Sequence, residues 1–313
     1  MTGLTLSEAY FREFGEPMLE RDFGSILPRL AIGLCGSGSE CYGYDDEISR
    51  DHDFEPGFCI FLPDEAIVDT CTEFALSRAY AQLPAEYSGF CRNRIGPVGG
   101  NRHGVIRSSD FFISKCGSPD GVLTMQAWLD IPEHYLLEAV NGRIFRDDSG
   151  VFTSIRTSLA SMPEDIILKK LSGSLLAMAQ SGQYNYARCI SRGDTAAAQL
   201  AVIEFVRSAM HAAFLLNGRY MPYYKWRFRA FRELPFMGSL HESFEFLISS
   251  DNSGSNAELK KSMIEDTASV VIGELKKRSL TQAVCNDLEK HAYSVNDHIR
   301  DNTVRTMDIF AAE

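Results

Sequence analysis

Residues 30–39 read LAIGLCGSGS, and residues 49–53 further along read SRDHD. The first six residues form a short, uninterrupted apolar run, which predicts a strand that is covered on both faces. This strand leads directly into Gly36-Ser37-Gly38-Ser39, a turn without bulky side chains. Glycine permits unusual backbone angles and lets a ligand approach the backbone closely, and exposed N–H groups and hydroxyls suit phosphate oxygens. We therefore expect this turn to bind a phosphorylated ligand.

Asp51 and Asp53 stand two residues apart, where we expect the start of the next strand, whose apolar run is 58–62. Residues i and i+2 of a strand project from the same face, which leaves His52 on the opposite one. Two carboxylates presented together can share hard divalent cations, Mg²⁺ or Mn²⁺, which bind carboxylates and substrate phosphates. The sequence therefore predicts Asp51 and Asp53 as catalytic metal ligands, with Arg50 beside them as a nucleotide-binding residue.

A Gly-Ser turn followed about a dozen residues later by Asp-x-Asp resembles the signature of the DNA polymerase beta-like nucleotidyltransferase superfamily. The best register places the Gly-Ser of that signature on Gly38-Ser39 and its metal pair on Asp51 and Asp53. The whole layout is similar to the minimal, aminoglycoside-nucleotidyltransferase-like bacterial branch. It is also similar to a poorly characterised family of unknown function that carries GSGSE, SRDHD, a helical YNxxR and a later YxPxYKW.

This resemblance implies a Mg²⁺-dependent or Mn²⁺-dependent transfer of a nucleoside monophosphate with release of pyrophosphate. It favours AMP from ATP as the transferred group and a hydroxyl of a small molecule or a protein as the acceptor. The metal ions would sit on Asp51 and Asp53, and the turn Gly36-Ser37-Gly38-Ser39 would hold the phosphates.

The chain departs from the superfamily at the third carboxylate, which usually comes from a later strand as metal ligand or base. The strand that we predict at 104–107 reads GVIR and contains no acid. Candidates elsewhere are Asp110, Glu138, Asp147 and Asp148, none with a defensible spacing. Two functions therefore stay open: an active transferase, or a nucleotide-binding or regulatory protein on the same fold without turnover.

The periodicity of the chain predicts an α+β fold, with a small mixed sheet in residues 1–155 and an all-α bundle in 156–313 that closes the substrate cleft. In the first part we expect one helix from Ser7, as its N-cap, to about 22, and another over 64–83. In the second part, 195–216 is apolar around most of its circumference and predicts the central helix of the bundle. Further helices are expected at 226–249, 257–278 and 280–299.

Residues 219–232 contain five basic residues, six aromatic residues and no acid. Lys225 in this segment, together with Arg188 in the YNxxR segment, is predicted to hold nucleotide phosphates from the helical domain. The alternative is a helix whose aromatic side chains form core and whose basic side chains are solvated or pair with the acidic first domain.

The formal net charge of the 313 residues is -11, and the first 150 residues hold 24 acidic and 12 basic residues against 18 and 19 in the rest. This balance argues against a broad nucleic-acid surface, so the expected partners are a nucleotide and its acceptor. The eight cysteines form no C-x-x-C pair, which indicates a reducing compartment. With neither a signal peptide nor a run of about 18 apolar residues, we expect a cytoplasmic protein without membrane contact.

Overall fold

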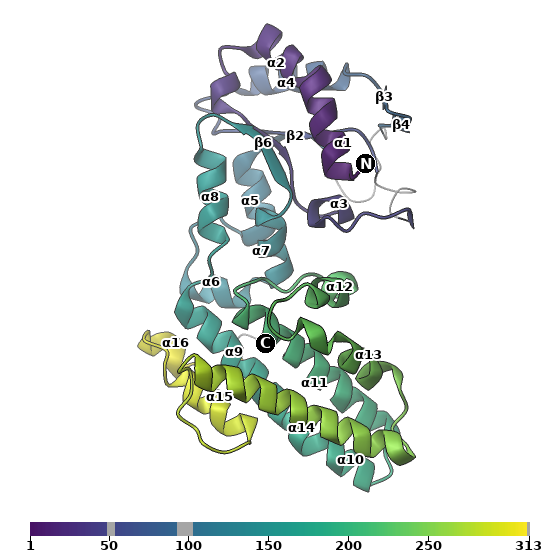
Figure 1. Cartoon of the computed structure of the whole chain (residues 1–313). Helices are drawn as coiled ribbons and strands as arrows, with labels where there is room; N and C mark the ends of the chain where they lie inside the picture. The colour runs from purple at the N-terminus through teal and green to yellow at the C-terminus, as the bar shows by residue number, and fades with distance from the viewer. Residues whose placement is uncertain (49–53, 93–102, 312–313) are drawn as a thin grey trace. The chain divides into compact units, whose positions relative to one another are not determined.

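The apolar runs of the first half form the strands of one sheet in the computed structural model, which describes residues 1–48, 54–92 and 103–311. The chain divides into two units. The first comprises Met1–Leu123 and Tyr135–Ser161, and the second comprises Thr124–His134 and Met162–Glu313. The first unit contains a small mixed sheet, and the described part of the second is helical, which confirms the predicted fold class (Figure 1).

The larger sheet of the first unit has the described strands in the order β5-β2-β1-β6, and β3 (Glu86–Tyr87) and β4 (Phe90–Cys91) form a separate two-stranded sheet. Strand β1 runs antiparallel to β2 and to β6, whereas β2 and β5 are parallel. The apolar runs predicted as strands are confirmed, but the second strand begins at Cys59, later than expected. Strand β6 was not predicted because it is an edge strand with mixed burial and three charged residues. The strands are β1 (Ala31–Leu34), β2 (Cys59–Leu62), β5 (Gly104–Arg107) and β6 (Arg143–Asp147).

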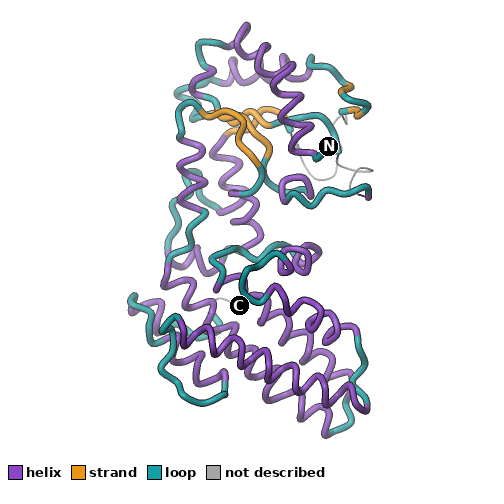
Figure 2. The backbone as a smooth tube through the Cα atoms, in the orientation of Figure 1, coloured by secondary structure: helices purple, strands orange, loops and turns teal. Residues whose placement is uncertain are grey.

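Both faces of the sheet are covered, as the continuous apolar runs predict (Figure 2). Ile32 and Ile60 belong to a buried cluster with residues of α1 (Gly3–Tyr10), α2 (Glu16–Phe23) and α4 (Thr70–Ala81). Phe61 points to the other face, because neighbouring strand residues alternate. Its ring stacks 4.2 Å from that of Phe152 in α8 (Val151–Leu159) and meets Phe111 of α5 (Ser108–Cys116) edge-on.

The first helix begins earlier than predicted, at Gly3, because the side chain of Thr2 accepts a hydrogen bond from Thr5 N and caps it. The prediction of Ser7 as N-cap was therefore wrong; its hydroxyl donates to the backbone oxygen of Gly57 instead. A π-helical turn, η1 (Phe11–Gly15), joins α1 to α2. The remaining elements that include first-unit residues are η2 (Leu27–Arg29), α3 (Ser39–Tyr42) and α7 (Glu133–Val140).

The second unit is built around α11 (Thr195–Leu216), which packs against α9 (Glu164–Met178). By length and composition α11 is apolar enough to cross a membrane, but 67% of its apolar window is buried inside the protein. The predicted central helix is therefore confirmed as a core helix. The helices that follow α9 and precede α11 are the π-helical η4 (Ala179–Tyr186) and α10 (Ala187–Ser191).

The helix expected over 226–249 is broken in two, because Pro235 lacks an N–H and Met237 adopts a positive φ of 69°. The helix expected over 280–299 is shorter, since the side chain of Asp287 caps it one residue before its start. The elements of this region are α6 (Met125–Asp130), η5 (Tyr224–Trp226), α12 (Arg227–Arg232), η6 (Gly238–Leu240), α13 (His241–Ser249), α14 (Gly254–Lys277), α15 (Leu288–Asn296) and α16 (Asn302–Thr306).

Candidate functional site

Several segments of the first unit that contain candidate functional residues lie at one edge of the sheet. Gly33 of β1 pairs with Cys59, the first residue of β2, and Cys59 pairs with Gly104, the first residue of β5. Because β1 is antiparallel to β2 and β6, its carboxyl end lies beside the amino ends of the other three strands. We call the segments at this edge the loop edge; they are residues 36–39, 55–58, 103–104 and 141–142.

The predicted phosphate-binding turn connects β1 to α3 at the loop edge. Gly36 and Gly38 have φ angles of 111° and 136°, which L side chains rarely adopt, so both positions favour glycine. The side-chain amide of Asn141 fixes the turn: its Oδ1 accepts from Gly36 N and its Nδ2 donates to Gly36 O, both at 2.8 Å. The structure thus brings Gly36, Ser37, Gly38 and Ser39 into one short turn, with Ser37 exposed.

Lys115 of α5 lies behind this turn, and the sequence analysis missed it. Its Cε is 3.9 Å from the point where a Cβ on residue 36 would stand. Its ammonium pairs with Glu138 at 2.5 Å, and the hydroxyl of Tyr42 lies 3.4 Å from the other oxygen of that carboxylate. The sequence signal that could have identified Lys115 is its spacing: it follows Phe111 by four residues and so lies on the same face of a helix that covers the sheet.

The backbone just before the turn sits in a positive electrostatic environment. Burial raises the pKa of the Cys35 thiol to about 11, while the charges of Arg156 and Lys115 act in the opposite direction. Arg156 is itself buried and donates to the backbone oxygens of Val140 and Asn141. Two cations thus lie close enough to act on the residue that precedes Gly36, and Glu138 balances the charge of one of them, Lys115.

The predicted metal ligands Asp51 and Asp53, and with them Arg50, lie outside the described residues. The strand that follows them begins at Cys59, and the shared face expected for the two carboxylates stays a prediction. Within residues 1–48, 54–92 and 103–311, no group of three or more His, Cys, Asp or Glu side chains could hold a metal ion. The metal site stays a prediction.

The four candidates for a third carboxylate have different positions. Asp147 caps α8 by accepting from Gly150 N and Thr153 N, and Asp148 pairs with Arg146. Asp110 is exposed in the first turn of α5. Glu138 is the candidate tied to the turn, through Lys115, and its two oxygens are already engaged with Lys115 and Tyr42.

Arg188 and Lys225 belong to the second unit, and each lies against an aromatic ring of its own segment. The guanidinium of Arg188 stacks 4.5 Å from the ring of Tyr184 and donates to its hydroxyl. The ammonium of Lys225 lies 5.0 Å from the ring of Trp226, and its side chain is exposed. Both are accessible cations, and their contact with a nucleotide stays a prediction.

The segment that carries Lys225 is anchored by a buried carboxylate that the sequence analysis also missed. Glu133 accepts from His211 Nε2 at 2.8 Å and from Met221 N at 2.9 Å, and Lys170 lies 3.7 Å away. Burial alone raises the pKa of Glu133, but the charges and hydrogen bonds of these partners outweigh it and lower the pKa to about 2. Glu133 is therefore ionised at neutral pH and fixes the start of the YMPYYKW segment.

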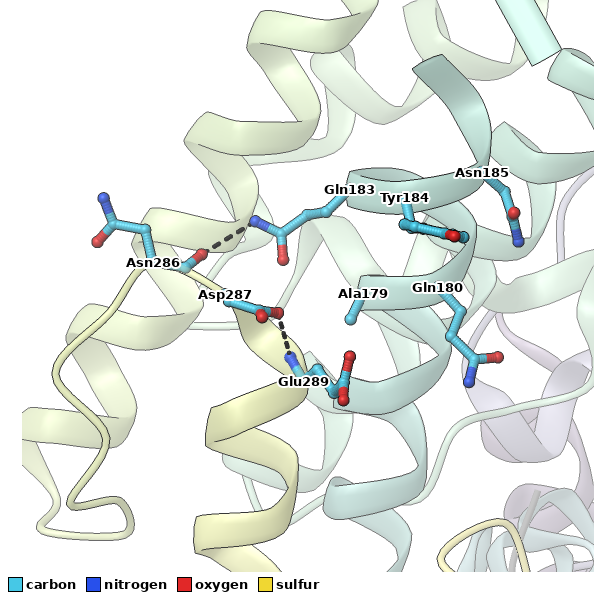
Figure 3. Close-up of a pocket in the computed structure, with 8 residues that line it drawn as sticks. All are labelled: Ala179, Gln180, Gln183, Tyr184, Asn185, Asn286, Asp287 and Glu289. Carbon is cyan, nitrogen blue, oxygen red and sulfur yellow. Dashed lines mark hydrogen bonds between the residues drawn. The ribbon is translucent and has the colours of Figure 1, made fainter. Parts of the chain in front are cut away.

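A pocket of about 780 Å³ opens on the second unit, beside the YNxxR segment (Figure 3). Gln180, Tyr184 and Asn185 line it from η4, a π-helical segment, and such segments are frequent at functional sites. The side chain of Gln183 donates to the backbone oxygen of Asn286, and the side chain of Asp287 accepts from Glu289 N. These two side chains therefore already make hydrogen bonds within the protein. Figure 3 shows the polar side chains around the pocket, which suit hydroxyl and amide groups.

Comparisons with known proteins match part of the chain. Residues 128–227 match a family described as a domain of unknown function (DUF4037), and no curated protein matches the chain. The chain is similar to the crystal structure of a nucleotidyltransferase-like protein from Exiguobacterium sibiricum 255-15, with 12% sequence identity and a TM-score of 0.35. That similarity covers 90% of this chain and 80% of the other.

Proposed function

We propose that the protein is a nucleotidyltransferase that transfers a nucleoside monophosphate, AMP from ATP, to a hydroxyl of a small molecule or a protein and releases pyrophosphate. The observation that carries the proposal is the turn Gly36–Ser39. It leaves the sheet at the loop edge, is fixed by Asn141 and has Lys115 behind it. Within 15 residues of the turn the sequence supplies Asp51 and Asp53.

In this proposal the backbone N–H groups of the turn, with the hydroxyls of Ser37 and Ser39, bind phosphate oxygens. Lys115 and Arg156 add positive charge behind them, which stabilises the negative charge that grows on the departing pyrophosphate. Arg188 and Lys225 are proposed as further phosphate ligands from the second unit. The chain's own residues thereby bind and orient the triphosphate.

A pair of carboxylates is the donor set that Mg²⁺ and Mn²⁺ accept, so Asp51 and Asp53 fit the metal that the proposal implies. When bound, the ion would neutralise phosphate charge and polarise the phosphorus–oxygen bond.

The test incubates the protein with labelled ATP, GTP, CTP or UTP, Mg²⁺ and a metabolite extract, and measures pyrophosphate. We expect nucleotide-dependent release that falls by about 100-fold or more in Asp51→Ala/Asp53→Ala, because metal ligation contributes several kcal/mol to the transition state. The matched control is Asp266→Ala/Asp297→Ala, two exposed aspartates of the second unit. Nucleotide binding without pyrophosphate would instead favour the regulatory alternative, and no nucleotide binding would exclude both.

A further inference from the structure

His103 occupies a fixed position at the loop edge, immediately before β5. Its ring lies on Gly57, where a Cβ would stand only 2.8 Å from the His103 Cγ. The backbone of this turn is held on both sides: Ser7 Oγ donates to Gly57 O, and Gly104 N donates to Phe58 O at 2.9 Å. The imidazole is thus seated against a rigid turn at the amino ends of β2 and β5.

A carboxylate orients this imidazole. Glu55 Oε1 lies 2.9 Å from His103 Nδ1, and the two side chains are 18% and 10% exposed. An ionised carboxylate only accepts hydrogen bonds, so Nδ1 carries the hydrogen and, in the neutral ring, Nε2 carries the lone pair. This Nε2 is buried and has no hydrogen-bond partner within the described ranges. Since buried polar atoms are nearly always paired, an unpaired one next to an orienting carboxylate indicates a group kept for a ligand.

The third-carboxylate candidate that is tied to the turn, Glu138, is already committed to other partners. It is engaged by Lys115 and Tyr42. In the sequence, Glu55 follows Asp53 by two residues, so the carboxylate that orients His103 belongs to the same short stretch of chain as the expected metal ligands.

We propose that His103 is the general base of the transfer and that Glu55 is its positioning residue; this inference rests on the proposed function. The acceptor hydroxyl attacks the α-phosphorus, forming the new oxygen–phosphorus bond while the bond to pyrophosphate breaks. The hydroxyl proton passes to His103 Nε2, and Glu55 stabilises the resulting imidazolium through Nδ1–H. The proton then leaves to water, which restores the neutral ring. His103 thereby supplies the base that GVIR at 104–107 lacks.

The test compares the wild type with His103→Gln and Glu55→Gln, using ATP, GTP, CTP and UTP with Mg²⁺ and a metabolite extract as the acceptor source. We expect pyrophosphate release to fall about 100-fold in His103→Gln and about tenfold in Glu55→Gln, the usual range for loss of a base and of its orienting group. Binding of Mg-ATP should stay within about twofold in both, because neither side chain is proposed to contact the triphosphate. The matched control His298→Gln, in the second unit, removes a ring whose Nδ1 bonds the backbone oxygen of Ser294, and it should release pyrophosphate at the wild-type rate.

The pH profile separates a base from a structural histidine. A general base acts only in its unprotonated form, so release by the wild type should rise with pH, and this rise should be absent in His103→Gln. Release within about threefold of the wild type in both variants would overturn the inference and leave the proposed function intact. Parallel loss of release and of Mg-ATP binding in folded His103→Gln would also overturn it, because it indicates a structural role. If His103→Gln does not fold, Glu55→Gln decides in the same way. If the wild type releases no pyrophosphate, the proposed nucleotidyl transfer is itself excluded.

Discussion

At the scale of single residues, the buried charge of Glu133 shows how much one side chain contributes to the second unit. Its carboxylate is 7% exposed and has three partners, His211, Lys170 and the Met221 N–H. Burial lowers the pKa of Lys170, whereas the charge of Glu133 acts in the opposite direction, and the ammonium also donates to Leu129 O at 3.4 Å. Removing Glu133 therefore leaves buried positive charge without compensation.

We predict that Glu133→Gln lowers the free energy of unfolding by about 3 kcal/mol at pH 7, measured by urea titration. The sign with pH follows from the lowered pKa. The contribution of Glu133 is fully present above its unfolded value of 4.5 and is lost as the pH falls from 4.5 toward 2. In Glu133→Gln, the free energy of unfolding should therefore fall less between pH 4.5 and pH 2 than it does in the wild type. The exposed Glu258→Gln serves as control, and a change below about 0.5 kcal/mol in Glu133→Gln would contradict the prediction.

At the scale of elements, the turn after β1 depends on the junction between α7 and β6, about a hundred residues away in sequence. The side chain of Asn141 makes two hydrogen bonds to the backbone of Gly36, in the way that a residue of a neighbouring strand would. The next residue, Gly142, donates to Cys41 O, and a Cβ there would stand 2.1 Å from Leu34 O. The turn and the junction therefore form one interlocked piece, in which neither can move alone.

We predict that Asn141→Ala lowers the free energy of unfolding by about 1–3 kcal/mol, because it leaves the amide and carbonyl of Gly36 without their partner. It should also weaken Mg-ATP binding by about tenfold, since the turn loses its fixed shape. Thermal unfolding and calorimetric titration measure the two effects. Asn286→Ala, an exposed amide of the second unit, is the control. If Asn141→Ala is destabilised but binds Mg-ATP as tightly as the wild type, the fixed shape of the turn does not contribute to nucleotide binding.

At the scale of the whole molecule, the chain passes from the first unit into the second at Thr124, returns at Tyr135 and leaves again at Met162. Residues 124–134 carry Trp128 and Leu129, both buried, and Glu133. A division of the chain at 155/156, as the sequence suggests, would separate Glu133 from His211 and Lys170.

We predict that a fragment of residues 156–313 loses cooperative unfolding, whereas a fragment of residues 124–313 keeps the helical unit intact. The physical reason is that the shorter fragment leaves the buried His211 and Lys170 without their carboxylate and exposes the surface that Trp128 and Leu129 cover. Circular dichroism during thermal unfolding compares the two. Equal midpoints of thermal unfolding in the two fragments would show that the second unit does not need residues 124–134.

The sequence alone determined the elements whose signal is local. The apolar runs of β1 and β2, the glycines of the turn and the apolar circumference of α11 each depend on neighbouring residues, so their patterns can be read without a fold. The pairing of Asp51 with Asp53 was also read from a local pattern, but it lies outside the described residues and stays a prediction. Boundaries were less accurate where a side chain decided them, as with the cap by Thr2 and the break at Pro235.

Only the tertiary structure decided which distant residues meet. His103 and Glu55 are 48 positions apart, Lys115 and Glu138 are 23 apart, and Glu133 and His211 are 78 apart. No periodicity relates such pairs, since their contact follows from strand register and helix packing rather than from spacing along the chain. The edge strand β6 also needed the sheet, because its charged residues give it no apolar run. The local pattern thus predicted a phosphate-binding turn, whereas strand register and helix packing placed Lys115 and Asn141 beside it and His103 at the same edge of the sheet.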